Sequence, residues 1–516
     1  MSQQGRDSGR RNRGDRDRSG YGSGRRGPSD RSGGGRGPRD GRRDPPNRDR
    51  PGPQREPRRT DREDRGPRSR PDRTSGREVA CEAVARFLDQ GDWLQDGLED
   101  ATRGSSLGTE EKAFARELAL GSVRRLRFLE WVVESWLDRG LPPDPEAHAA
   151  LVLGAYQLLF TRVPEHAAVA ESVSLVSERM RPVANAVLRR VAEAVVDEVD
   201  PDSWSDTVEV GEGRVFVCRR PLPEEPLERL SLLTSLPRGL LRSWTETVGG
   251  VRARERALDS LEVPGLHLRP AGRYLEGART GLQRALADRG TVTAFDPGSG
   301  GYGQPGTLRV LGGRSPFATG LFTDGGFVVQ DPTALRAVDA LEAQPGETVL
   351  DLCAAPGTKT ARLAEQVGSQ GRVFAFDSDR KRAMKIDETK ERLGLDAIER
   401  LSGWPRKELG DRALVDVPCS NTGVLARRVE VRHRLDPRSI VSLVEIQQDL
   451  LSRAVDSVRR GGRIVYSTCS LEVEENRSVV DAVLAARQDL RLIRDEVVEP
   501  RQPLRDGGYH AVLERV

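Results

Sequence analysis

Two of the five cysteines in this 516-residue chain come shortly after stretches of strand-type residues. Cys419 closes the segment Asp416-Val-Pro-Cys, which follows the run ALV, and Cys469 follows the run RIVYST. Functional side chains gather just past the carboxyl ends of strands, so both positions favour chemistry over packing. Consecutive strands are commonly neighbours, and we therefore expect both thiols to face one pocket.

Two thiols and one carboxylate suit the methylation of a pyrimidine ring at C5. This carbon is not nucleophilic until a group has added to C6, and a thiolate is a strong nucleophile for that addition. An acid near N3 stabilises the resulting enamine, and a base must then remove the C5 proton so that the thiolate can leave. Two unrelated buried cysteines are the simpler alternative for the same residues.

A third segment, LDLCAAPGTKT at 350–360, is predicted to form a strand, a turn of small residues and the start of a helix. Small residues let the backbone approach a ligand closely, and a helix N-terminus favours a negative group. Further along, the run FAFD ends a predicted strand in Asp377, whose carboxylate suits the hydroxyls of a ribose. The two features together predict a site for S-adenosylmethionine, and an ordinary surface aspartate at 377 is the alternative.

The elements that must position these segments alternate between strand and helix over residues 326–516. Near-continuous apolar strands separated by helices predict a parallel, doubly wound α/β sheet, which binds ligands beyond the carboxyl ends of its strands. A long amphipathic helix from Ser439 is expected to stop at Gly461 and Gly462. These residues are therefore predicted to form a Rossmann-like domain.

Three further regions precede this domain. Residues 77–198 are predicted to be all-helical, because Ser75 and Glu78 form a capping box and apolar residues then recur at helical spacing. Residues 199–235 are rich in Pro, Asp and Glu and are interpreted as a linker. Short, mixed signals over residues 236–325 predict a small α+β module.

The first 76 residues differ from the rest in composition. They contain 23 Arg, no Lys and 12 Asp or Glu, a net charge of +11, and they lack Val, Ile and Leu. Such a segment cannot bury enough apolar surface to fold, so we predict a disordered Arg/Gly-rich tail of the kind that attaches to nucleic acid. A solubilising tail is the alternative. The whole chain carries +3, so the remaining residues carry −8, and any nucleic-acid footprint on them must be a local patch.

Other classes of protein fit the composition poorly. No apolar stretch approaches the roughly 20 residues that span a bilayer, and no apolar region follows the basic N-terminus as it would in a signal peptide. The five cysteines are odd in number and widely spaced, which argues against a disulfide framework. The five histidines show no metal-ligand spacing. We expect a cytoplasmic protein that binds neither a membrane nor a metal.

Several longer sequence segments resemble those of two known families. The segments GFVVQDPTAL, DLCAAPGTKT, VDVPCSNTGVL and YSTCSLEVEEN together resemble the Sun/Fmu (RsmB-like) family of bacterial 16S rRNA cytosine-5 methyltransferases. In the helical region, LGAYQLLFTRVPEHAAVAESVSLV followed by VANAVLRRV resembles the NusB family of RNA-binding domains. The resemblance covers roughly residues 77–516. It implies a NusB-like domain joined to a Rossmann-like methyltransferase domain, S-adenosylmethionine as cofactor and 16S rRNA as partner, and we expect a monomer.

The resemblance also implies roles for individual residues. Cys469 would be the nucleophile that attacks C6, Cys419 would assist product release, and Asp416 would contact the cytosine ring close to the cofactor. Asp377 would hold the ribose. The loop implied to bind the cofactor comprises Cys353, Ala354, Ala355, Pro356, Gly357, Thr358 and Lys359.

The chain departs from the family pattern at three places. Thr358 stands where a second glycine is usual, and Ser402 and Gly403 stand where an acid would contact the adenine side. The third departure follows the segment GVLARR, where the family usually has Pro-Asp and then a Trp. This chain has Val429, Glu430 and His433 there instead. These losses raise the alternative of a NusB-type RNA-binding scaffold with weakened catalysis.

A third hypothesis, an amino-methyltransferase, is disfavoured because a nucleophilic cysteine has no use in direct transfer to nitrogen. For an RNA substrate, the cytosine must leave its stack to reach the thiolate, so a loop or an unfolded precursor is the expected target. Arg269, in the predicted strand LHLRP, is expected either to help hold the RNA or to be an ordinary exposed arginine.

Overall fold

The computed structural model describes residues 75–103, 105–198, 206–275, 278–295 and 306–516. The chain divides into two units, Met1–Arg68 and Ser69–Val516, and all described residues belong to the second unit. The predicted tail, 1–76, lies outside the described residues except for its last two positions.

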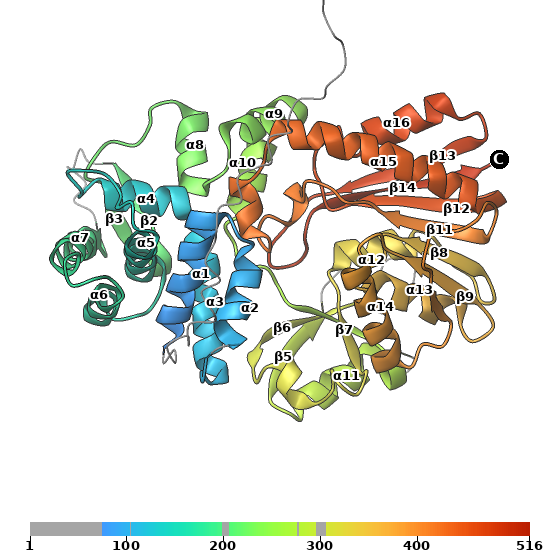
Figure 1. The fold of residues 1–516 in the computed structure, drawn as a ribbon, viewed down its shortest axis with the longest axis horizontal. Coiled ribbons are helices and arrows are strands. Elements are labelled where there is room, and N and C mark those ends of the chain that lie inside the picture. The colour runs from blue at the N-terminus through green and yellow to red at the C-terminus, as the bar shows by residue number, and fades with distance from the viewer. Residues whose placement is uncertain (1–74, 104, 199–205, 276–277, 296–305) are drawn as a thin grey trace, which may run out of the picture. The chain divides into compact units, whose positions relative to one another are not determined.

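The N-terminal part is helical, as predicted (Figure 1). Ser75 Oγ accepts a hydrogen bond from Glu78 N, and the Glu78 carboxylate accepts one from Ser75 N, so the predicted capping box begins the first helix. The central helix α5 is buried along nearly its whole length, and the other helices pack around it. The helices are α1 (Gly76–Gln90), α2 (Leu94–Arg103), α3 (Thr109–Arg124), α4 (Leu126–Glu134), α5 (Pro145–Phe160), α6 (Glu165–Ser174) and α7 (Arg181–Glu193).

The segment interpreted as a linker is folded over its described part. A three-stranded antiparallel sheet, in the order β1-β3-β2, packs onto the helices through the fully buried Phe216. The Phe216 ring lies edge-on to Phe128, with ring centroids 6.5 Å apart. The many charged residues of this segment hide one short apolar strand, VFV, whose burial depends on the distant helices. The first strand, β1 (Val195–Val196), lies at the end of the region that was predicted to be all-helical. The segment itself contains β2 (Thr207–Glu209), β3 (Val215–Val217) and α8 (Pro226–Thr234).

The next region separates into two packing groups. Helices α9 (Arg238–Val248) and α10 (Gly250–Asp259) share an apolar core with residues of the loops that follow Cys419 and Cys469. The four-stranded sheet β5-β6-β4-β7 has its own core with α11. The strand β7, which was predicted to open the last domain, pairs with β4 instead. This group comprises β4 (His267–Pro270), α11 (Ala278–Ala287), β5 (Thr291–Phe295), β6 (Leu308–Gly313) and β7 (Phe327–Val329).

The C-terminal part contains a seven-stranded sheet in the order β10-β9-β8-β11-β12-β14-β13. The pairs from β10 to β12 are parallel, as predicted, whereas β14 runs antiparallel to both of its neighbours. The strands are β8 (Thr348–Leu352), β9 (Arg372–Phe376), β10 (Ile398–Arg400), β11 (Gly410–Asp416), β12 (Val458–Thr468), β13 (Leu490–Val498) and β14 (Gly508–Arg515).

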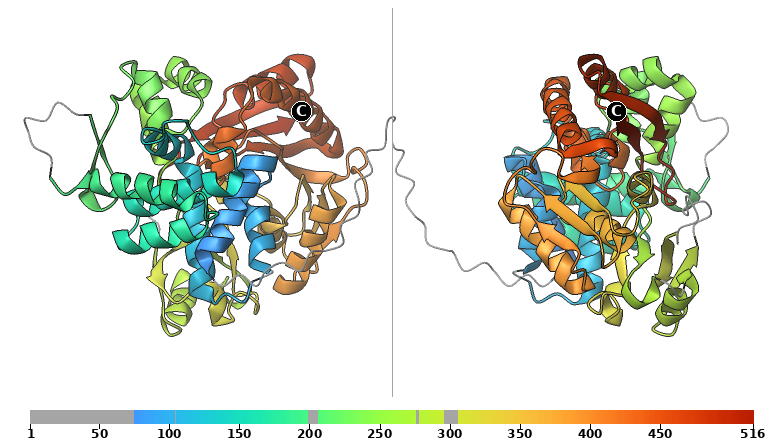
Figure 2. Two further views of the ribbon diagram at one scale, coloured as in Figure 1. Left: turned by 60° about the vertical axis from the view of Figure 1, so that its left-hand side comes forward. Right: turned by 90° about the vertical axis from the view of Figure 1, so that its right-hand side faces the viewer.

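Helices cover both faces of this sheet, and Figure 2 shows these layers from two further sides. One apolar core lies under α12, α13 and α14, and a second lies under α15 and α16. The helix α15 ends at Ser457, earlier than predicted, because the chain passes directly into β12, which contains Gly461 at φ 77°. The helices are α12 (Pro332–Asp339), α13 (Thr358–Val367), α14 (Arg380–Leu393), α15 (Pro437–Ser457) and α16 (Arg477–Ala486).

The strand order reverses direction between β8 and β11. From β8 the chain goes on to β9 and β10 on one side, and from β11 it goes on to β12 on the other. In register, Leu352 pairs with Val415, and Asp416 pairs with Ser467. The residues that follow β8, β11 and β12 therefore meet at one edge, where ligands bind in sheets of this kind.

Candidate active site

The structure brings the two predicted cysteines together. Cys469 directly follows β12, Cys419 follows β11, and their sulfur atoms lie 3.1 Å apart. Asn421 links the two: its Oδ1 lies 3.2 Å from Cys469 Sγ, and its Nδ2 donates to the Cys419 carbonyl at 2.7 Å. Cys419 is buried and Cys469 is partly exposed, so Cys469 is the more accessible of the two thiols.

Two glycines let three loops meet beside the thiols. Gly423 N donates to the Cys469 carbonyl at 2.9 Å, and Gly507 N donates to the Gly423 carbonyl at 2.8 Å. A Cβ atom added at Gly423 would lie 2.6 Å from the backbone of Gly507 and 2.9 Å from the Cys469 oxygen. A side chain at this position would therefore push the Cys419 loop away from the Cys469 loop.

A buried carboxylate that the sequence interpretation missed holds the same two loops. Glu475 is fully buried and accepts from Ser420 N at 2.9 Å and from Ser470 Oγ at 2.6 Å. These serines directly follow Cys419 and Cys469, and Gln447 Nε2 donates to the same carboxylate at 3.0 Å. The segment YSTCSLEVEEN contains Glu475, but its sequence neighbours do not distinguish Glu475 from the exposed Glu474.

The two thiols differ in electrostatic environment. The hydrogen bond with Cys469, burial and the nearby Glu475 carboxylate raise the pKa of Cys419 well above its ordinary value. Cys419 therefore stays a protonated thiol at neutral pH, and its S–H can donate to the Cys469 sulfur.

Asp416, the third predicted catalytic residue, is held by two neighbours. Lys359 Nζ forms an ion pair with one of its oxygens, and Ser467 Oγ donates to the other at 2.7 Å. Burial lowers the pKa of Lys359, but the adjacent Asp416 carboxylate outweighs that effect, so the pKa is raised above its ordinary value. Lys359 was predicted to belong to the cofactor loop. In the structure its ammonium group contacts Asp416, the predicted catalytic carboxylate.

The rest of the predicted cofactor loop forms a tight turn after β8. Cys353 has a positive φ of 67°, and Ala354 N donates to the Phe376 carbonyl at 2.9 Å. The Asp377 carboxylate accepts from Ala355 N at 3.1 Å and from Asp379 N at 3.0 Å. Asp377 therefore joins this turn to the end of β9.

The end of the turn leads into α13. Gly357, at φ 97°, precedes the helix, and a Cβ atom there would lie 3.2 Å from the Ile386 Cα. Pro356 is exposed, and Thr358 is the first residue of α13. The substituted glycine at 358 therefore lies in the helix rather than in the tight part of the turn.

One buried acid in β8 has spare hydrogen-bonding capacity. Asp351 Oδ2 accepts from Thr360 Oγ1 at 2.6 Å, and its Oδ1 has no partner among the described residues. Burial raises the pKa of Asp351 to about 7. An unpaired buried acceptor next to a ligand-binding turn can receive a hydrogen bond from a bound molecule.

The adenine side of the predicted site has no carboxylate from the third strand. Ser402 and Gly403, which replace the expected acid, are both exposed. The next residue, Trp404, lies edge-on to Phe376 with ring centroids 5.5 Å apart, and the Arg453 guanidinium lies 4.0 Å from the Trp404 ring centroid. An aromatic wall therefore stands near the position of the missing acid.

Both expectations for Arg269, a contact with RNA and an ordinary exposed arginine, are wrong. The side chain is 1 % exposed, pairs with Glu365 and donates to Gln330 Oε1 at 2.8 Å. Arg269 thus joins β4 to the first helix after the cofactor turn, and it is unavailable to a ligand.

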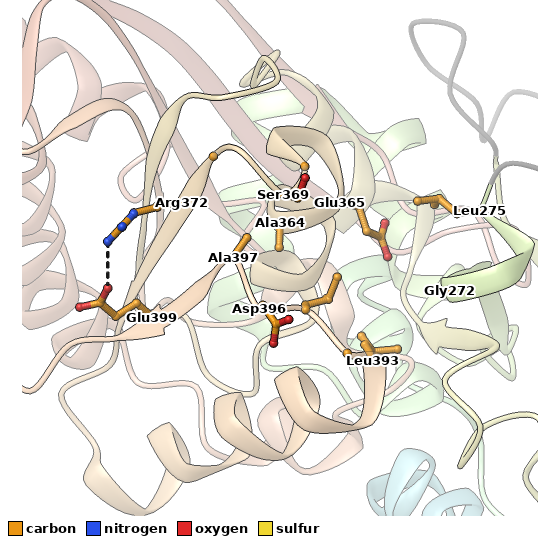
Figure 3. Close-up of a pocket in the computed structure, with 14 residues that line it drawn as sticks. Gly272, Leu275, Ala364, Glu365, Ser369, Arg372, Leu393, Asp396, Ala397 and Glu399 are labelled. Carbon is orange, nitrogen blue, oxygen red and sulfur yellow. Dashed lines mark ion pairs between the residues drawn. The ribbon is translucent and has the colours of Figure 1, made fainter.

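Two cavities lie at opposite edges of the large sheet. A cavity of about 60 Å³ is lined by Lys359, Asp416 and Cys469, together with residues of α12 and β14. A cavity of about 690 Å³ lies at the end of α13 and the starts of β9 and β10, where Arg372 and Glu399 pair at 3.9 Å (Figure 3). Its described lining contains no cysteine, histidine or lysine, so the larger hollow lacks the groups that the chemistry requires.

The described ranges offer neither a metal site nor a membrane-spanning helix. They contain no group of three or more His, Cys, Asp or Glu side chains placed to hold a metal ion. Nor does any helix there combine the length and apolarity that crossing a membrane requires.

Comparisons with known proteins identify the family of this chain. The family described as 16S rRNA methyltransferase RsmB/F matches residues 338–510, and the NusB family matches residues 74–193. The probable ribosomal RNA small subunit methyltransferase B of Synechocystis sp. is 32 % identical over 434 residues, which cover 81 % of this chain and 90 % of the relative. The chain belongs to the RsmB/F family of 16S rRNA methyltransferases.

Other RsmB/F relatives match over similar lengths. The ribosomal RNA small subunit methyltransferase B of Proteus mirabilis is 29 % identical over 450 residues, which cover 85 % of this chain and 98 % of that protein. Among solved structures, the crystal structure of PH0851 superposes with a TM-score of 0.66 at 21 % identity, and covers 86 % of this chain and 99 % of its own. It shares the fold. The chain is thus an rRNA methyltransferase with a NusB domain.

Proposed function

We propose that this methyltransferase acts on C5 of a cytosine in 16S rRNA and yields 5-methylcytosine. In this proposal Cys469 forms a covalent adduct at C6, Cys419 releases the product, and S-adenosylmethionine is the methyl donor. The observation that carries the proposal is the 3.1 Å separation of the Cys419 and Cys469 sulfur atoms, beside a carboxylate that is held in place. Direct transfer to nitrogen or oxygen requires no such pair.

The residues after β8 and β9 fit S-adenosylmethionine. Each Asp377 oxygen accepts one backbone hydrogen bond and keeps a lone pair for a ribose hydroxyl, and the unpartnered Asp351 Oδ1 suits a positively charged ammonium. We assign the cofactor to Asp377 and to the turn of Cys353, Ala354, Ala355, Pro356, Gly357 and Thr358. When bound, it supplies an electrophilic methyl group.

Cys469 starts the reaction. In this proposal its sulfur attacks as the thiolate, with the S–H of Cys419 and the Lys359 ammonium group close to it. Attack on C6 forms an S–C bond and moves the electrons of the C5–C6 double bond into the ring, which makes C5 nucleophilic. Asp416, held by Lys359 and Ser467, is placed to contact the edge of the ring.

Cys419 acts in the second half of the reaction. After methylation, a base takes the C5 proton, the electrons of that C–H bond form the C5–C6 double bond again, and the C6–S bond breaks with its electron pair on the Cys469 sulfur. A thiol at Cys419 that donates to the departing sulfur stabilises the Cys469 thiolate as a leaving group. Without Cys419, the adduct should persist.

The remaining parts serve the RNA in this proposal. We assign RNA binding to the NusB-like helices of residues 77–198 and salt-dependent attraction to the basic tail, 1–76. The target cytosine must be unstacked before its C6 can reach a thiolate at the edge of the sheet. Two thiols 3.1 Å apart persist unoxidised only in a reducing compartment, which supports a cytoplasmic enzyme.

The direct test is methyl transfer to 16S rRNA that lacks the modification. The purified protein is incubated with this RNA and S-adenosylmethionine labelled in its methyl group, and the RNA is digested to nucleosides. We expect label in 5-methylcytidine. Label in another nucleoside would exclude the two-cysteine reaction, and no label together with no binding of the cofactor would favour the RNA-binding scaffold.

A further inference from the structure

Residues 425–434, which follow the Cys419 loop, connect the active site to the helical region through one buried arginine. Arg432 is 1 % exposed and makes no ion pair with a carboxylate among the described residues. Its guanidinium donates to five backbone carbonyl oxygens at 2.8–3.2 Å. These oxygens belong to Arg124, Thr234, Ser260, Leu425 and Val429.

Three of these carbonyls stand at the C-terminal ends of helices. Arg124 ends α3, Thr234 ends α8, and Ser260 is the C-cap residue of α10. The last carbonyls of a helix have no partner within the helix, and the helix dipole places partial negative charge there. One buried cation therefore satisfies three helix ends from separate parts of the chain, which explains how its charge is tolerated.

The neighbours of Arg432 strengthen the same contact. His433 Nε2 lies 2.8 Å from the Val123 carbonyl, and the Arg434 guanidinium lies 4.1 Å from the ring centroid of Trp93 in the helical region. In the opposite direction, Arg124 donates from its own side chain to the Ala426 carbonyl at 2.9 Å. Side chains of this segment thus donate to the backbone of α3, and a side chain of α3 donates to the backbone of the segment.

The other end of the segment is fixed at the cysteines. Gly423 is bonded to the Cys469 and Gly507 backbones, as described above. Arg427 then pairs with Asp331 at 3.0 Å and with Asp506, two acids in the wall of the small cavity. A short stretch of chain therefore runs from the cysteine loops to the ends of α3, α8 and α10, of which α3 belongs to the helical region.

We propose that Arg432 is a positioning residue that holds the Cys419 loop in its catalytic conformation through docking of the helical region. Arg432 touches no reacting group and acts through the backbone of residues 425–429. The proposal rests on the two-cysteine reaction described above. It makes the NusB-like helices part of the machinery for catalysis, in addition to any role in binding RNA.

The test uses the full chain with Cys419→Ala, in which the adduct with 16S rRNA should accumulate. Arg432→Lys keeps the charge but loses the planar fork of donors that reaches several carbonyls at once. We expect adduct formation to slow at least tenfold, with the affinity for S-adenosylmethionine changed less than twofold. The control is Arg269→Met, which removes an arginine that is also 1 % exposed but contacts Glu365 and Gln330 instead.

Hydrogen exchange supplies a readout that does not depend on the reaction. Amides of residues 419–431 should exchange faster in Arg432→Lys than in the parent, and those of α13 should not. Arg124→Met, which removes a single bond to Ala426, should produce a smaller change of the same kind and replaces Arg432→Lys if that variant does not fold.

Unchanged adduct rates and unchanged exchange in Arg432→Lys would overturn the proposal. So would equal losses of adduct rate and cofactor affinity in Arg432→Lys and Arg269→Met, because general destabilisation would then explain both. If Cys419→Ala alone forms no adduct, the two-cysteine reaction fails, and the exchange data still decide whether Arg432 holds the loop.

Discussion

The two edges of the seven-stranded sheet differ in volume and in chemistry, and they differ in opposite directions. The N-terminal edge has a cavity of about 690 Å³ lined by small residues, leucines and the charged side chains of Glu365, Arg372, Asp396 and Glu399, and the C-terminal edge has one of about 60 Å³. Only the small cavity is lined by a thiol, a lysine and an aspartate that lie close together. Convergent groups at strand ends, rather than volume, are therefore the basis on which we assign the active site to the C-terminal edge.

Filling each cavity with the same side chain separates the two edges most strongly. Ala334 lines the cavity beside Cys469, and Ser369 lines the larger one. We expect Ala334→Phe to lower methyl transfer about 100-fold, because the ring occupies the space that the cytosine needs. Ser369→Phe should change it less than twofold. Both rates come from single-turnover transfer of labelled methyl groups to 16S rRNA.

The opposite result would contradict the assignment of the active site to the C-terminal edge. A large loss in Ser369→Phe with normal activity in Ala334→Phe would place substrate binding at the N-terminal edge. Thermal unfolding of both variants controls for misfolding.

A smaller effect is expected for the carboxylate that holds both cysteine loops. Glu475→Gln places an amide donor against groups that already donate, which should cost about 1–3 kcal/mol in the free energy of unfolding. The loss of loop geometry should slow adduct formation by about tenfold. Urea unfolding and single-turnover kinetics measure the two effects.

The matched control for this change is Glu474→Gln. Glu474 is the exposed neighbour of Glu475 and should tolerate the same substitution without effect. Equal behaviour of the two variants would mean that Glu475 does not hold the loops.

The smallest effect on activity is expected for His433, which contacts α3 behind the C-terminal edge. Its effect is on the free energy of unfolding and is absent at neutral pH. Burial lowers the pKa of His433 from about 6.5 to about 4, with smaller contributions from Arg432 and Arg127. Between these values the unfolded chain binds a proton that the folded chain does not. The free energy of unfolding should therefore fall as the pH falls from 6.5 to 4, by at most about 3 kcal/mol.

His433→Gln isolates this term, because glutamine can still donate to the Val123 carbonyl and does not titrate. Urea unfolding of both proteins at pH 7.5 and pH 5 should show a steeper loss of stability in the parent. Identical pH dependence would show that His433 is protonated equally in the folded and unfolded chains.

Much of the C-terminal edge could be predicted from the sequence because its signals are local. The helix at Thr358–Val367, the strand ends at Asp377 and Asp416 and the cysteines beyond them follow from apolar runs and turn residues. The parallel character of the sheet follows from the helices between its strands, whereas the antiparallel strand β14 between β12 and β13 was not predicted. These features do not depend on contacts between distant parts of the chain.

The features that were missed are decided by distant contacts. Glu474 and Glu475 have the same local sequence context, and only the meeting of two serine-containing loops buries the second. Arg269 and Arg432 are both buried, although arginine is usually exposed. Arg432 is buried because three helix ends meet around it, and no periodicity in the sequence reports that meeting.

The division of labour between the two thiols is tested most directly by trapping the adduct with 16S rRNA on denaturing gels. The variants Cys419→Ala and Cys469→Ala differ by the position of one sulfur in a pair 3.1 Å apart. We expect Cys419→Ala to accumulate a covalent RNA complex through Cys469, and Cys469→Ala to form none. Equal amounts of complex in the two variants, or a complex only in Cys469→Ala, would contradict the assignment of attack to Cys469 and release to Cys419.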